Sequence, residues 1–148
     1  MFQQRRPGRQ EPGMTYDELI EAVRYDGLYP TRERAEEVTR TVLAALGRQL
    51  TGEERVALAG VLPRRAARVL AAEIPAPERL TGWGFVKDIA AHTPGSTRAT
   101  ARWDAGSVLG IIGRLAGPEL RRRILGQLPE GYALLFGQAE LARPPQPA

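Results

Sequence analysis

The chain repeats itself along its length, and this repeat limits its fold more than any other feature. Thr31-Arg32 aligns with Thr97-Arg98 and Leu62-Pro63 aligns with Leu128-Pro129, without any gap, at a shift of 66 positions. Apolar character also recurs at this shift where the identity of the residue changes. Self-similarity at a fixed period indicates a duplicated supersecondary unit. We therefore expect two tandem copies of one unit.

Each copy has the start and stop signals of four helices. In the first copy, Thr15 with Glu18 and Thr51 with Glu54 match the capping box, and Gly27 suits the left-handed cap that ends a helix. The longest helix carries an apolar stripe at helical spacing, formed by Ala35, Val38, Val42, Leu46 and Leu50. No run of residues shows the alternation of a strand. The sequence predicts an all-α fold of two tandem four-helix units, about eight helices, packed as one compact helical domain.

Proline-rich segments mark the boundaries of the two copies. Pro75 and Pro77 stiffen the connection between them, and three prolines crowd the C-terminal end. We predict a disordered N-terminal tail at 1–14, repeat 1 at 15–73, a linker at 74–80, repeat 2 at 81–141 and a disordered C-terminal tail at 142–148.

Three segments of the chain carry a resemblance to a known family. They are residues 15–23 (TYDELIEAV), residues 42–47 (VLAALG), and Leu62-Pro63 with its later echo Leu128-Pro129. With the duplicated layout, they resemble the bacterial domain of unknown function 2267 family over about residues 14–141. These motifs are helix caps and core positions, so the resemblance implies a two-repeat helical fold and no particular activity. In the second copy, Gly82-Trp83-Gly84 replaces the residues that open the first helix.

The composition excludes several classes of protein. Without cysteine, the chain has no disulfide framework, catalytic thiolate or thiolate zinc site. No stretch approaches the roughly 20 apolar residues of a membrane span, and the polar start of the chain is unlike a signal peptide. We therefore expect a cytoplasmic protein without membrane contact. The net charge of +4 is spread over the N-terminal tail and the second copy, so it is a weak indicator of nucleic-acid binding.

No group of residues has the pattern of an active site. The only histidine, His92, follows Asp88 by one helical turn but has no nucleophile motif or metal-ligand cluster beside it. Adjacent carboxylates such as Glu36-Glu37 point about 100° apart on a helix and cannot act as a pair. We expect a protein that is not an enzyme and holds no cofactor or metal.

A second-copy helix face is altered where the first copy stays polar. Trp103 lies on the side of its helix opposite the apolar stripe, and Gly106, Ser107 and Gly110 share that side. Small residues one turn apart let another helix approach closely, and tryptophan is a common interface anchor. These four residues are the predicted interaction face, covered either by the first copy or by another chain. Our leading hypothesis is a non-enzymatic helical protein-interaction module that binds a protein partner or itself.

The alternative hypothesis is an arginine-mediated nucleic-acid binding protein. Arg121, Arg122 and Arg123 are consecutive on a predicted helix, and at least one must face water or a partner because they span about 200°. With Arg114, they are the predicted anion or nucleic-acid contacts. Their spacing does not predict a base-reading geometry. A third hypothesis, that the chain carries a small ligand, has no support beyond the apolar core.

Overall fold

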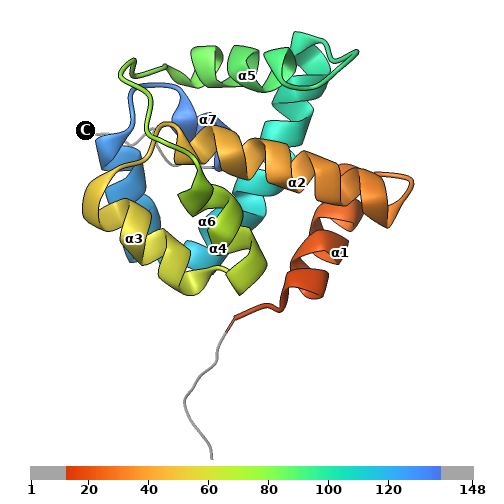
Figure 1. Cartoon of the computed structure of the whole chain (residues 1–148), viewed down its shortest axis with the longest axis horizontal. Helices are drawn as coiled ribbons and strands as arrows, with labels where there is room; N and C mark the ends of the chain where they lie inside the picture. Colours follow the sequence, from red (N-terminus) through yellow and green to blue (C-terminus); the bar gives the residue numbers. More distant parts are fainter. Residues whose placement is uncertain (1–12, 138–148) are drawn as a thin grey trace, which may run out of the picture.

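The computed structural model describes residues 13–137, which form seven helices around a common core (Figure 1). Most of the two predicted tails lies outside the described residues. Met14, which we placed in the N-terminal tail, packs against the core. The helices are α1 (Tyr16–Gly27), α2 (Arg32–Gly47), α3 (Gly52–Val61), α4 (Arg64–Ala72), α5 (Gly82–Ala91), α6 (Arg98–Gln127) and α7 (Tyr132–Leu135).

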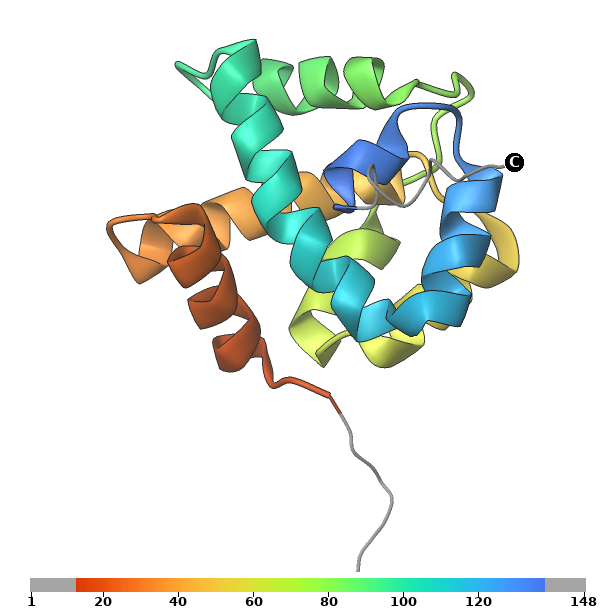
Figure 2. The same cartoon turned by 180° about the vertical axis from the view of Figure 1, so that it is seen from behind.

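The halves are interlocked, because the first helix of each half packs against the long helix of the other. Helix α1 contacts α6 as well as its neighbour α2, and α5 contacts α2 as well as its neighbour α6. The long helices α2 and α6 also contact each other (Figure 2). Buried side chains from both halves form one cluster. The core therefore belongs to the whole chain and not to either repeat.

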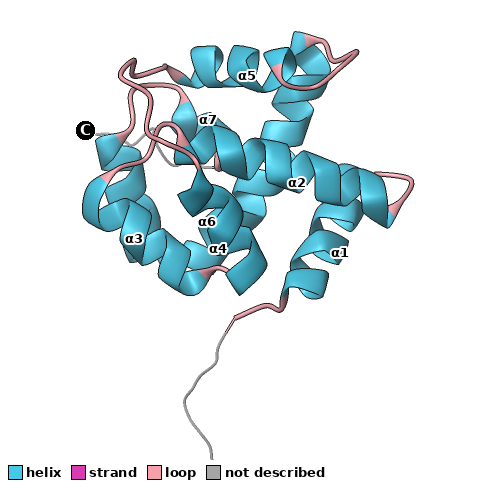
Figure 3. Cartoon of the chain, viewed as in Figure 1, coloured by secondary structure: helices cyan, strands magenta, loops and turns pink. Residues whose placement is uncertain are grey.

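The predicted all-α fold is confirmed, and no strand occurs between residues 13 and 137 (Figure 3). No helix in this range is both long enough and apolar enough to span a membrane. The helix count is seven where we expected about eight. Helix α6 runs across Gly117, whose counterpart Thr51 separates α2 from α3. Because Gly117 is not helical (φ 82°, ψ 164°), α6 consists of two helices joined at a kink, and Pro118 opens the second.

The turn after α1 differs from our expectation. Leu28, and not Gly27, takes the left-handed conformation that ends the helix (φ 58°, ψ 37°). Gly27 remains helical and buried, and a Cβ atom there would overlap the ring of Tyr29. Glycine is therefore required at this position for the close approach of Tyr29, while the neighbouring leucine takes the less favourable backbone conformation.

The predicted capping box of Thr51 and Glu54 is wrong, because the second half caps α3 instead. The side chain of Gln127 accepts a hydrogen bond from the Thr51 backbone N–H (2.7 Å). Its Nε2 atom donates to the Thr51 carbonyl oxygen (2.9 Å) and to Oε1 of Glu54 (2.9 Å). A partner 76 residues away thus replaces a local motif, which sequence spacing could not indicate.

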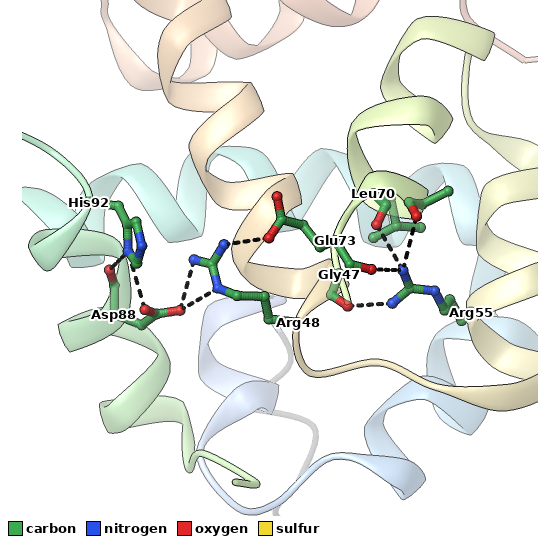
Figure 4. Close-up of polar contacts among 8 residues, drawn as sticks. Gly47, Arg48, Arg55, Leu70, Glu73, Asp88 and His92 are labelled. Carbon is green, nitrogen blue, oxygen red and sulfur yellow. Dashed lines mark hydrogen bonds and ion pairs between the residues drawn. The ribbon is translucent and has the colours of Figure 1, made fainter. Parts of the chain in front are cut away.

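Arg55 holds the ends of α2 and α4 together (Figure 4). Its guanidinium group donates to the carbonyl oxygens of Gly47, Leu70 (3.1 Å) and Glu73 (2.6 Å). These oxygens lie where a helix runs out of its own donors, and a cation is favourable there. Among the described residues, the counterpart Arg121 donates to the Gly113 carbonyl oxygen alone (3.3 Å), at the equivalent end of its own long helix segment.

This difference gives a prediction with an internal control. Arg55→Ala should lower the free energy of unfolding by about 3 kcal/mol, because it leaves several carbonyl oxygens without a charged donor. Arg121→Ala, which removes the equivalent but sparser contact, should cost about 1 kcal/mol or less. Urea denaturation followed by circular dichroism measures both. Equal losses in the two variants would contradict the role given to Arg55.

Candidate functional site

Two surface grooves lie at equivalent positions in the two halves. The first, which we call the α2 groove, has a volume of about 600 Å³; the second, the α6 groove, has about 350 Å³. The α2 groove lies between α2, α4 and the end of α5. The α6 groove lies along α6 beside the end of α1, and its lining comprises Asp26, Arg102, Trp103, Gly106, Ser107, Gly110 and Arg114.

The equivalence of the grooves follows from the repeat and from the interlocked halves. Gly106, Ser107, Gly110 and Arg114 in the α6 groove stand 66 positions after Arg40, Thr41, Ala44 and Arg48 in the α2 groove. Asp26, at the end of α1, is likewise the counterpart of His92, at the end of α5. Each groove therefore combines the long helix of one half with the end of the first helix of the other. Helix α4 also lines the α2 groove, whereas no residue of its counterpart α7 lines the α6 groove.

The four residues of the predicted interaction face lie together in the α6 groove. The Trp103 side chain is half-exposed (52%), and its Nε1–H donates to the Gly27 carbonyl oxygen (2.9 Å). A Cβ atom built at Gly106 or Gly110 would meet no neighbouring atom within 4 Å among the described residues. The first half thus contacts this face at Trp103 and leaves space open over the two glycines.

A buried hydrogen bond joins the turn after α1 to α6 beside Trp103. The Tyr29 hydroxyl donates to Oδ1 of Asp104 (2.6 Å), and both side chains are buried. Burial raises the pKa of the Asp104 carboxyl group, and the hydrogen bond from Tyr29 opposes this rise only in part. Burial, followed by the hydrogen bond to Asp104, also raises the pKa of Tyr29. Arg114 also forms a solvent-exposed ion pair with Asp26 at the end of α1 (3.2 Å).

The four predicted anion contacts are not brought to one site. Arg114 lines the α6 groove, whereas Arg121 points to the Gly113 carbonyl oxygen. Arg122 pairs with Glu119 (3.0 Å), and Arg123 pairs with Glu54 on α3 (3.2 Å). Each arginine therefore has a partner within the chain.

The α2 groove brings together basic residues that the sequence analysis missed. Arg40, Arg65 and Arg68 are exposed along its rim, and Arg48 and His92 lie at its end. Arg48 lies between Glu73 (3.0 Å) and Asp88 (2.9 Å), and Nδ1 of His92 is 3.3 Å from Asp88 (Figure 4). The pairing of α2 with α4 creates the cluster, so no single stretch of sequence contains its signal. Within residues 13–137, no group of three or more potential ligand residues could hold a metal ion.

The raised pKa of Asp104 predicts how pH changes stability. In the unfolded chain this carboxyl group ionises at its ordinary pKa. Between that pKa and the raised pKa of the folded state, the unfolded state therefore binds fewer protons than the folded state. The free energy of unfolding should therefore fall as pH rises through this window. Asp104→Asn cannot ionise but still accepts the Tyr29 hydrogen bond. Urea denaturation between about pH 4 and about pH 7 should show the variant gaining stability relative to the wild type as pH rises. If the free energies of unfolding of the wild type and the variant changed in parallel with pH, the burial of an ionisable group at this position would be contradicted.

Comparison with known proteins places the chain in a family. No curated protein matches its sequence. The family model described as "Uncharacterized conserved protein (DUF2267)" matches residues 16–135, which run from the first residue of α1 to the last residue of α7. This confirms the resemblance found in the sequence: the chain belongs to the domain of unknown function 2267 family.

Proposed function

We propose that this chain is a non-enzymatic protein-interaction module, and that its α6 groove receives a helix of another polypeptide chain. The observation that carries the proposal is the open space over Gly106 and Gly110 beside the half-exposed Trp103. No other ribbon lies in front of the middle of α6 where it crosses the near face of the molecule in Figure 2. A groove of about 350 Å³ in this place is accessible from outside.

The chemistry of the α6 groove suits helix packing. Two glycines one turn apart allow the axis of an incoming helix to come close, because no side chain separates the two backbones. Trp103 supplies a large apolar ring that is already held by its hydrogen bond to Gly27. An anchor that is fixed before binding loses little conformational entropy on binding, which favours affinity.

A second copy of the chain is the occupant that fits best. If two α6 helices cross in antiparallel directions midway between Gly106 and Gly110, Gly106 of one copy faces Gly110 of the other. Trp103 then lies close to Arg114 of the second copy, where a guanidinium group can stack on the indole ring. A two-fold interface of this kind uses the same patch twice, and the groove carries the charges of both signs that such self-complementarity requires.

The nucleic-acid alternative has less support. Arg121, Arg122 and Arg123 are each engaged by an oxygen of the same chain, so a phosphate would have to displace an existing partner. Arg114 is engaged by Asp26 in the α6 groove. No contact in the described part of the chain favours the arginine cluster as the site of function.

Gly110→Arg tests the proposal, because it fills the open space without disturbing the fold. Sedimentation equilibrium at micromolar concentrations should show a wild-type dimer and a monomeric variant, with a loss of about 2 kcal/mol or more in association. The variant should keep its stability, or gain up to about 1 kcal/mol, because arginine favours a helix interior more than glycine. Gly126→Arg is the matched control: it makes the same change in α6, also in open space, outside the groove. It should still dimerise.

Two results would overturn the proposal. One is equal dimerisation of the Gly110 and Gly126 variants. The other is a wild-type protein that stays monomeric, together with a variant carrying a photo-crosslinking residue at the groove position 102 that captures neither a second copy nor another protein in host cells.

A further inference from the structure

The α2 groove combines an apolar floor with a basic rim. Ala44 from α2 and Val69 from α4 are half-buried in the floor, and Arg40, Arg65 and Arg68 are exposed around them. An apolar groove between two helices is a common binding site for a third, amphipathic helix. The volume of about 600 Å³ is larger than that of the α6 groove.

The positive charge of this groove is compensated only in part. Arg48 is satisfied by Glu73 and Asp88. Arg65 is 3.3 Å from Glu36 and lies over the ring of Tyr16. In contrast, Arg40 and Arg68 form no ion pair with any residue of the described range 13–137.

The two free arginines come from different helices, so their charges bracket the groove. Arg40 belongs to α2 and Arg68 to α4, and both side chains are exposed. A ligand lying along the floor would therefore meet a cation on each side. This placement favours an extended acidic ligand over a single small anion.

The second half shows that the fold does not need these arginines. The counterparts of Arg40 and Arg68 are Gly106 on α6 and Leu134 on α7, which is shorter than the equivalent α4. Helices thus form at both equivalent positions without a charge there. The arginines are therefore free to serve binding, and the α2 groove is both larger and richer in arginine than its counterpart.

We infer that the α2 groove binds an acidic amphipathic helix of a partner protein. Small apolar side chains of that helix would cover Ala44 and Val69, and its carboxylates would pair with Arg40 and Arg68. The described lining includes no phenylalanine, tyrosine or tryptophan on which a nucleic-acid base could stack, and its floor is aliphatic. A peptide helix therefore uses the whole groove, whereas a phosphate backbone would use only its rim.

The binding test uses the full chain and a series of helical peptides. The peptides share one apolar face and carry from none to several glutamates on its flanks, with glutamine at the other flank positions. Fluorescence anisotropy should show affinity rising with the number of glutamates and falling as salt is added. The Arg40→Glu/Arg68→Glu double variant should lose about 10-fold or more in affinity for the most acidic peptide. The reason is that ion pairs between these arginines and the peptide glutamates are replaced by repulsion between carboxylates.

The Arg64→Glu/Arg98→Glu double variant is a control with the same total charge change outside both grooves. Arg64 is exposed on α4, and neither residue lines this groove. This control should bind within about 3-fold of the wild type, since only distant charge has changed. Running the series in the Gly110→Arg background separates this inference from the proposed α6 interface, because a monomer with a blocked α6 groove should still bind the acidic peptides.

Three outcomes would overturn the inference. The first is an affinity that does not depend on the number of glutamates, including no binding at all up to about 1 mM peptide. The second is an equal loss in the control and in the groove variant. The third is single-stranded RNA that binds more tightly than any peptide and whose binding depends on Arg40 and Arg68. Such a result would assign the groove to nucleic acid.

Discussion

The structure depends on the first helix of each half, which packs against the long helices of both halves. Because α1 packs on α6 and α5 packs on α2, each long helix is covered partly by its own half and partly by the other. A unit of about 60 residues buries too little apolar surface to be more than marginally stable alone. The interlocked arrangement removes this difficulty by building one core from both units. It also places the end of each first helix against the other half's long helix, where a groove results.

The duplicated framework explains how one fold carries two different surfaces. The α2 and α6 grooves are made by equivalent positions, yet one is rimmed by arginines and the other is lined by glycines beside a tryptophan. Residues of the core must be kept in both copies, whereas residues of a groove can diverge without loss of the fold. The clearest case is Gly106, which faces open space, whereas its counterpart in the first copy is Arg40. Such divergence is what separate binding roles for the two halves would produce.

Much of the fold could be predicted because helix caps and apolar spacing are local signals. Thr15 caps α1 as expected, and threonines at equivalent helix starts, Thr31, Thr81 and Thr97, cap α2, α5 and α6. The spacing on α6 also placed Trp103 correctly beside the small residues of one face. Non-local contacts could not be predicted. Gln127 replaces the local cap of α3, and the ring of Tyr29 imposes the glycine that we had assigned to a turn.

The basic groove was missed for the same reason, because Arg40 and Arg68 belong to helices that meet only in the folded chain. If one core serves the whole chain, neither half is stable without the other. Hydrogen exchange measured at increasing urea concentrations tests it directly, since it reports the unfolding free energy of each helix separately. The slowest amides of α2 and α6 should converge on one free energy and one urea dependence. Exchange of the α2 amides through a lower-energy opening that leaves α6 protected would show that the halves unfold independently and would contradict this account.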